Sequence, residues 1–68
     1  MNNQNLLIGK LVKHIETNSI WKIKEVQKKQ IVTLCIEPGK TDSDKNALNK
    51  ILLSNGNLPS RYKLTSLN

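Results

Sequence analysis

The chain has 68 residues, which limits it to one domain with a modest hydrophobic core, since short chains bury a small fraction of their surface. It has no phenylalanine, one tryptophan (Trp21) and one tyrosine (Tyr62), so isoleucine, leucine and valine must supply most of the core. The formal net charge of +6 favours an anionic partner such as nucleic acid or an acidic protein surface, although codon bias in an AT-rich genome would produce the same excess of lysine and asparagine.

The N-terminal part of the chain is predicted to begin with disorder and to continue as a strand. Residues 1–5 are polar and expected to be disordered, and residues 6–68 are expected to form a single small domain. Within residues 6–16, apolar residues recur at helical spacing, but Gly9 costs a helix about 1 kcal/mol and suits the bend that begins a barrel strand. Their β-branched residues favour a strand, which we predict, with a short helix as the alternative. Residues 16–19 predict a turn.

The middle of the chain, residues 19–38, is predicted to form a β-hairpin. With Lys28 and Lys29 as the central turn residues, Ile23 lies opposite Leu34, and successive side chains point to opposite faces. The predicted apolar face consists of Trp21, Ile23, Val32, Leu34 and Ile36. The predicted polar face consists of Lys22, Lys24, Thr33 and Cys35, with Val26 and Ile31 near the turn. A four-residue loop is the alternative turn, and a register slip of one residue would exchange the faces.

Residues 42–54 carry the pattern of an amphipathic helix, after Pro38 ends the preceding strand. Thr41 can act as the N-cap of a capping box with Asp44, and acidic residues in this turn favour the positive end of the helix dipole. The apolar stripe at helical spacing is formed by Ala47, Leu48, Ile51 and Leu52. Gly56 can supply a left-handed residue at the C-terminal end of this helix.

The last segment, residues 61–67, alternates between two faces and predicts a closing strand that fits a sheet edge. The predicted order is therefore β-β-β-α-β, a mainly β fold with one helix (α+β), arranged as a small, partly open barrel. If residues 6–16 are helical instead, an α-β-β-α-β mini-domain is the alternative.

Four short stretches carry a resemblance to a known class of barrels. They are Gly9-Lys10-Leu11-Val12, Ser19-Ile20-Trp21-Lys22-Ile23, Ile31-Val32-Thr33-Leu34 and Tyr62-Lys63-Leu64. Their rhythm resembles the strands of SH3-like barrels of the KOW and Tudor type, which begin with a glycine and a valine-bearing strand and continue with a hairpin of two longer strands. The resemblance implies a small barrel over most of the chain. The predicted helix departs from it, because such barrels usually have a short strand and one helical turn at that point.

The candidate binding residues are basic and centre on the hairpin. Lysines on a protruding ribbon suit contacts to phosphates, which are electrostatic and largely independent of sequence. Tyr62 is expected to be exposed and able to stack on an unpaired base, whereas Trp21 shares the apolar face and is expected in the core. The predicted nucleic-acid-binding residues are Lys22, Lys24, Lys28, Lys29, Lys10, Lys13, Arg61, Tyr62 and Lys63. A solvated polar face without a partner is the alternative interpretation.

Catalytic and metal-binding patterns are not apparent in the sequence. His14 has only Glu16 near it as a possible co-ligand, and the single cysteine, Cys35, excludes an internal disulfide and a cysteine-based zinc site. No nucleophile, base and acid form a catalytic set, so we expect no enzyme activity, no metal and no cofactor. Because the sequence has no signal-peptide pattern and no long apolar run, the expected location is the cytoplasm, without membrane contact.

Two functional hypotheses follow from these patterns. The first is a small β-rich module that binds DNA or RNA through the lysine-rich hairpin in a regulatory or accessory role. The second is a protein-interaction module, a small subunit or inhibitor that docks its basic face on a larger acidic protein or adds the edge at 64–67 to a partner sheet. The short, Asn- and Lys-rich composition fits a bacterial, phage or mobile-element product, and homo-oligomerisation would complete a thin core.

Overall fold

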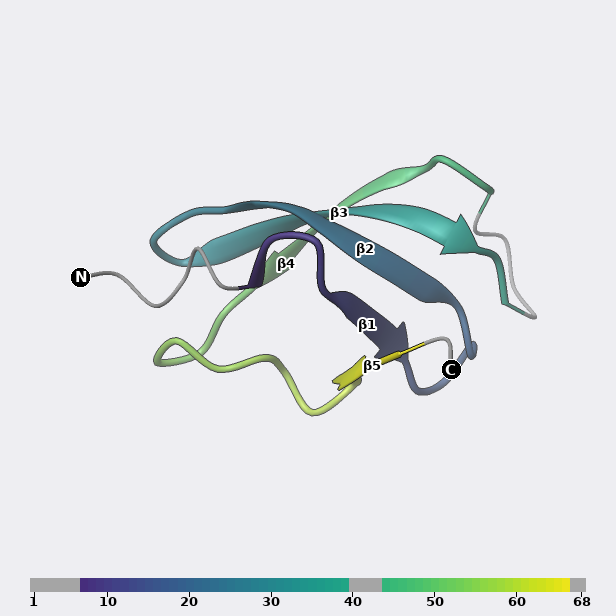
Figure 1. The fold of residues 1–68 in the computed structure, drawn as a ribbon. Helices are drawn as coiled ribbons and strands as arrows, with labels where there is room; N and C mark the ends of the chain where they lie inside the picture. Colours follow the sequence, from purple (N-terminus) through teal and green to yellow (C-terminus); the bar gives the residue numbers. More distant parts are fainter. Residues whose placement is uncertain (1–6, 40–43, 67–68) are drawn as a thin grey trace.

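The computed structural model describes residues 7–39 and 44–66, which form one antiparallel sheet of five strands (Figure 1). The strands are β1 (Leu11–His14), β2 (Ile20–Val26), β3 (Gln30–Glu37), β4 (Leu48–Leu52) and β5 (Tyr62–Thr65). Their order across the sheet is β4-β3-β2-β1-β5, so the first four strands form a meander and β5 returns to pair with β1. The sheet curls into a half-barrel whose two free edges are β4 and β5 (Figure 1).

The core of the half-barrel is small and mostly aliphatic. Its buried hydrophobic side chains are Val12, Trp21, Ile23, Ile31, Cys35 and Ile51. They come from four strands, and half-buried Leu53 and Leu58 pack against them. Thr33, fully buried in the middle of β3, donates its hydroxyl hydrogen to the carbonyl oxygen of Asn49 at 3.0 Å, so its polar atom has a partner. The expected role of Trp21 as a core residue is confirmed.

The predicted helix over 42–54 is wrong, because the second half of this segment is strand β4. Its inward-facing residues alternate, with Asn49 half-buried and Ile51 buried, whereas Leu48 and Leu52 are 67% and 68% exposed. The two exposed leucines match helical spacing, but they belong to the outer face of a strand that is hydrogen-bonded to β3. Pairing with an existing sheet therefore overrides the local helical pattern.

With β4 in place, the predicted α+β fold class is corrected to an all-β sheet, compatible with a small barrel. Both predicted orders, β-β-β-α-β and α-β-β-α-β, fail because the described residues contain no helix at those positions. The proposed N-cap Thr41 lies outside the described residues. Along 7–39 and 44–66, no helix is long and apolar enough to cross a membrane.

The chain leaves β4 through a tight turn at Asn55 and Gly56. Their φ angles are 52° and 79°, and positive φ at both central residues is the signature of a type I′ turn. Ser54 and Asn57 close the turn with two backbone hydrogen bonds of 2.9 Å each. Gly56 thus has the left-handed conformation that the sequence predicted, but it lies in a hairpin turn and not at the end of a helix.

The β2–β3 hairpin has the predicted turn but not the predicted faces. Val26 lies opposite Ile31 as predicted, and the register then shifts between Ile23 and Glu25, leaving Lys24 as an extra residue. Trp21 and Ile23 are buried as expected. On β3, however, the core-facing residues are Ile31, Thr33 and Cys35, and the half-buried outer ones are Val32, Leu34 and Ile36. The bulge therefore reverses the predicted faces of β3.

The predicted first and last strands are present, each shorter than expected. β1 covers four residues after a turn in which Gly9 has φ 88°, the expected bend, and the helical alternative is wrong there. β5 pairs with β1 and forms one sheet edge, as predicted. The predicted disorder of residues 1–5 and the domain start at residue 6 lie outside the described residues.

The chain after β3 packs tightly against the turn between β1 and β2. A Cβ atom on Gly39 would overlap the carbonyl group of Thr17 and lie 2.8 Å from the amide nitrogen of Ser19. Because these neighbours are backbone atoms, rotating a side chain cannot relieve the overlap. Glycine at this position therefore lets the β1–β2 turn lie close to the end of β3.

Candidate nucleic-acid interface

The outer face of the sheet brings three of the predicted lysines together. Lys13 on β1 lies directly opposite Lys63 on β5, and Lys22 on β2 lies opposite Leu11, which makes it the diagonal neighbour of Lys13. Directly opposed residues of antiparallel strands share a face, with Cβ atoms about 4.5–5.5 Å apart, and diagonal neighbours are roughly 7–8 Å apart. Lys13, Lys22 and Lys63 are termed the lysine cluster below.

No carboxylate of the described residues neutralises the lysine cluster. The ion pairs in this part of the chain join Glu16 to His14 and to Arg61, each at 3.9 Å. Glu37, on the same row of the sheet as Lys13, is two strands away. Like charges directly opposite each other destabilise an antiparallel pair, so the cluster concentrates positive charge at a cost to the sheet.

A shallow hollow lies beside two members of the lysine cluster. Its volume is about 280 Å³, and it is lined by Lys13, Ile15, Asn18, Lys63, Leu64 and Thr65. The two ammonium groups can donate hydrogen bonds to an anion, and the amide and hydroxyl groups add further donors. The apolar side chains can pack against an adjoining sugar. The arrangement suits a phosphate of a nucleic acid backbone, a contact that positions the chain without reading its sequence.

The other predicted lysines do not join the cluster. Lys28 and Lys29 lie at the hairpin tip, six residues or more beyond Lys22, which is about 20 Å in an extended strand. Lys24 is the extra residue of the bulge, and Lys10 precedes β1. All four are exposed. The structure therefore divides the predicted basic stripe into a hairpin tip and a cluster on the strands.

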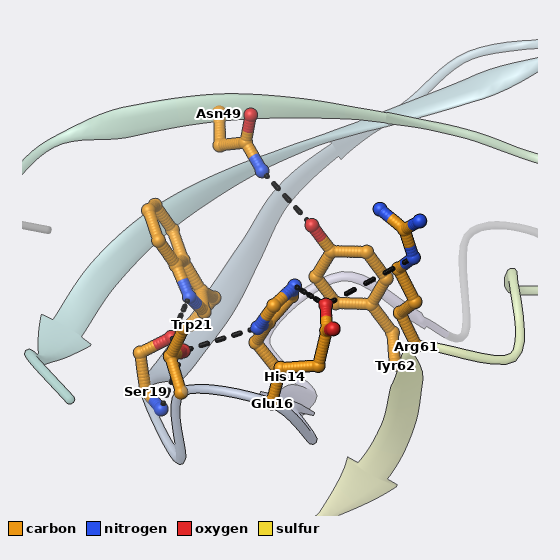
Figure 2. A network of polar contacts seen from close by, with 8 residues as sticks. His14, Glu16, Ser19, Trp21, Asn49, Arg61 and Tyr62 are labelled. Atoms are coloured by element: carbon orange, nitrogen blue, oxygen red, sulfur yellow. Dashed lines mark hydrogen bonds and ion pairs between the residues drawn. The ribbon is translucent and has the colours of Figure 1, made fainter. Parts of the chain in front are cut away.

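Tyr62 belongs to a second site, between strands β4 and β5, and Arg61 is connected to it through an ion pair with Glu16 (Figure 2). Tyr62 is half-buried and not exposed as predicted, because its ring packs edge-on against His14 with the ring centroids 4.8 Å apart. Its hydroxyl oxygen accepts a hydrogen bond from Asn49 Nδ2 at 3.4 Å, and this bond links the two sheet edges. Arg61 is exposed and lies 3.9 Å from Glu16.

Hydroxyl groups of the β1–β2 turn connect the rings of this second site. The indole N–H of Trp21 donates to Ser19 Oγ at 2.8 Å, and the hydroxyl groups of Ser19 and Thr17 are 2.7 Å apart. Thr17 Oγ1 lies in turn 3.0 Å from His14 Nδ1. Because an indole N–H can only donate, the chain of bonds holds the Trp21 ring in one orientation.

These groups surround a cavity of about 240 Å³, termed the polar hollow. It is lined by His14, Thr17, Ser19, Trp21, Leu48, Asn49 and Tyr62. Most of these residues were not among the predicted site residues, and they come from distant parts of the sequence. The exposed aromatic expected at Tyr62 was the one signal for this site in the sequence.

The described residues contain neither an accessible cysteine nor a group of metal-ligating side chains that would form a further candidate site. Cys35 is fully buried, and burial raises the pKa of its thiol, outweighing a backbone hydrogen bond at Glu37. A buried, protonated thiol is a poor nucleophile. Within the described segments, no three metal-ligating side chains form a group.

Comparisons with known proteins give no family for this chain. It matches no protein-family model, and no curated protein or solved structure is significantly similar to it. The arguments for function therefore come from the half-barrel, the lysine cluster and the polar hollow.

Proposed function

We propose that the protein is a small, non-enzymatic module that binds nucleic acid through the lysine cluster, in a regulatory or accessory role. The observation that carries the proposal is the position of Lys13 opposite Lys63, with Lys22 diagonal to Lys13. Three like charges close together on a sheet face raise the free energy of the folded protein. A bound chain of phosphates would remove that repulsion, so phosphate binding would explain why three lysines lie together at a cost in stability.

The strand order supports the finer assignment of the sheet as an SH3-like barrel of the KOW or Tudor type. A meander of four strands with β5 returning to β1 agrees with the strand rhythm that the sequence shares with those barrels. The predicted helix, which argued against this assignment, is replaced by β4. Since one fold supports many functions, the functional proposal rests on the lysine cluster and not on the fold.

Fluorescence anisotropy with labelled single- and double-stranded DNA and RNA tests the proposal. The affinity should fall steeply between about 50 and 200 mM salt, because each phosphate contact contributes about 0.7–0.9 to the negative slope of log affinity against log salt. Replacing all three residues of the lysine cluster with glutamine should reduce this slope by about 2–3.

A second triple variant controls for net charge. Replacing Lys28, Lys29 and Lys45 with glutamine removes the same charge from exposed positions outside the cluster. Because Lys28 and Lys29 were also predicted to bind nucleic acid, a nearly unchanged salt slope in this variant would assign the contacts to the cluster and not to the hairpin tip. If both triple variants weaken binding equally, the cluster has no special role, and either net charge or the hairpin tip contributes as much. If the wild-type protein binds none of the four nucleic acids at low salt, the proposal is wrong and the basic face should be tested against acidic proteins.

A further inference from the structure

The polar hollow has no part in the backbone contacts proposed above. It is lined by Asn49 of β4 and Tyr62 of β5, so it lies between the two free edges of the sheet. Its volume of about 240 Å³ is below the roughly 300–1,000 Å³ of pockets for drug-sized ligands, so it suits a ligand with a single ring system.

The walls of the polar hollow combine flat rings with hydrogen-bonding groups (Figure 2). The Trp21 ring is held in place by its bond to Ser19. The bond from Asn49 Nδ2 to the Tyr62 hydroxyl is 3.4 Å long, beyond the roughly 2.7–3.2 Å of a well-formed N–H···O bond. Breaking this long bond costs little, so the amide and the phenol can turn toward a ligand while the indole stays fixed.

We infer that the polar hollow receives one unpaired nucleobase of a single strand whose phosphates lie on the lysine cluster, an inference that rests on the proposed function. A base has flat faces that stack on aromatic side chains. Its edge carries donors and acceptors, which an asparagine amide can match with two hydrogen bonds. In a duplex the faces are stacked and the edge is paired, so the hollow favours single strands.

The path of the strand follows from two neighbouring residues of β5. Lys63 belongs to the lysine cluster on the outer face, and Tyr62, the preceding residue, points to the opposite face and lines the polar hollow. Because β5 is a free edge, a strand can pass around it with a phosphate at Lys63 and the attached base at Tyr62.

The charged residues linked to the lining of the polar hollow do not oppose such a strand. The one carboxylate in the polar network there, that of Glu16, has cationic or polar nitrogens of His14 and Arg61 within 3.9 Å. The side chain of Arg61 is 72% exposed, so it can leave this weak pair for a phosphate.

The single tryptophan makes the test direct, because Trp21 lines the polar hollow. Homopolymeric single strands of each base, about eight nucleotides long, and a duplex would be titrated while Trp21 fluorescence and the anisotropy of the labelled nucleic acid are read together. Single strands should change both signals, and one base should do so at the lowest concentration. The duplex should change anisotropy alone.

Two variants of the hollow test the assignment of the amide and the phenol. Asn49→Ala should lower the affinity for the preferred base by about tenfold and leave the salt slope unchanged, because it removes no charge. Tyr62→Phe keeps the ring and removes only the hydroxyl, so it tests the same edge contacts with minimal risk to folding. Asn57→Ala, an exposed asparagine outside the polar hollow, is the matched control and should bind as the wild type does.

The possible results separate this inference from the proposed function. Binding without a change in Trp21 fluorescence, together with equal affinities for Asn49→Ala and Asn57→Ala, would overturn the base-binding hollow and leave phosphate binding by the lysine cluster intact. Absence of binding to every probe would overturn both. A base-dependent change in Trp21 fluorescence that Asn49→Ala abolishes would support the hollow.

Discussion

Replacing Lys63 with glutamate should make the protein more stable and, at the same time, a weaker binder of nucleic acid. Lys63 faces Lys13 directly across β5 and β1. A like-charge pair in this position is unfavourable and an opposite-charge pair favourable, each by about 0.2–1 kcal/mol, so the exchange is worth about 0.4–2 kcal/mol. Solvent screening at the exposed Lys63 reduces the expected gain in the free energy of unfolding to about 0.5–1 kcal/mol, or roughly 2–8 °C in Tm for a domain of this size.

Urea unfolding followed by Trp21 fluorescence measures this gain, first at low salt and then at about 1 M salt, where the Debye length is about 3 Å and the gain should largely disappear. Lys50→Glu is the matched control, because Lys50 on β4 faces Val32 and not another lysine. A Lys63→Glu protein no more stable than the wild type at low salt would refute the reasoning. Equal stabilisation by Lys50→Glu would assign the gain to net charge.

Three further predictions concern single residues. Gly39→Ala should lower the free energy of unfolding by about 1–3 kcal/mol, because the added methyl group meets the Thr17 backbone; an unchanged Tm would mean that the two segments are not in close contact. Gly56→Ala should lower the free energy of unfolding by about 1–2 kcal/mol because of the φ of 79° alone, since the space around Gly56 is open. Gly56→Asn should lower it less, and equal losses for the two variants in urea unfolding would contradict a left-handed turn. Burial raises the pKa of the Cys35 thiol, so part of the stability should be lost as pH rises above the thiol's ordinary value of about 8.5; a Cys35→Ala protein with the same decline would show that the thiol is not its source.

Local patterns were sufficient to place the elements whose ends carry strong turn residues. β3 is a run of apolar and β-branched residues that ends before Pro38, and its strand character follows from these residues alone. β4 differs because Leu48 and Leu52 repeat at a helical interval, and the deciding interaction is its pairing with β3. The Asn55–Gly56 pair was a local signal for a hairpin turn after this segment, and it argues against a helix there.

The candidate sites depend on strand register, which the sequence does not encode locally. Lys13 and Lys63 were both predicted to bind nucleic acid, but their direct opposition exists only because β5 returns to β1 in one register. The polar hollow was harder to predict from the sequence than the lysine cluster, since His14, Asn49 and Tyr62 come from three strands and meet only in the curled sheet.

The bulge at Lys24 determines which side of β3 becomes the interior of the protein. The side that faces outward, with Val32, Leu34 and Ile36, is more apolar than the side that faces the core, with Ile31, Thr33 and Cys35. If Lys24 were paired within the ladder, Ile23 would lie opposite Leu34 and the side of β3 with Val32, Leu34 and Ile36 would face the core, whereas the bulge sets Ile23 opposite Thr33. In evolutionary terms, a deletion of the Lys24 codon would remove the bulge and retain the pairing of Ile23 with Thr33, so the present inside and outside of the longest strand would survive the loss of the residue that set them.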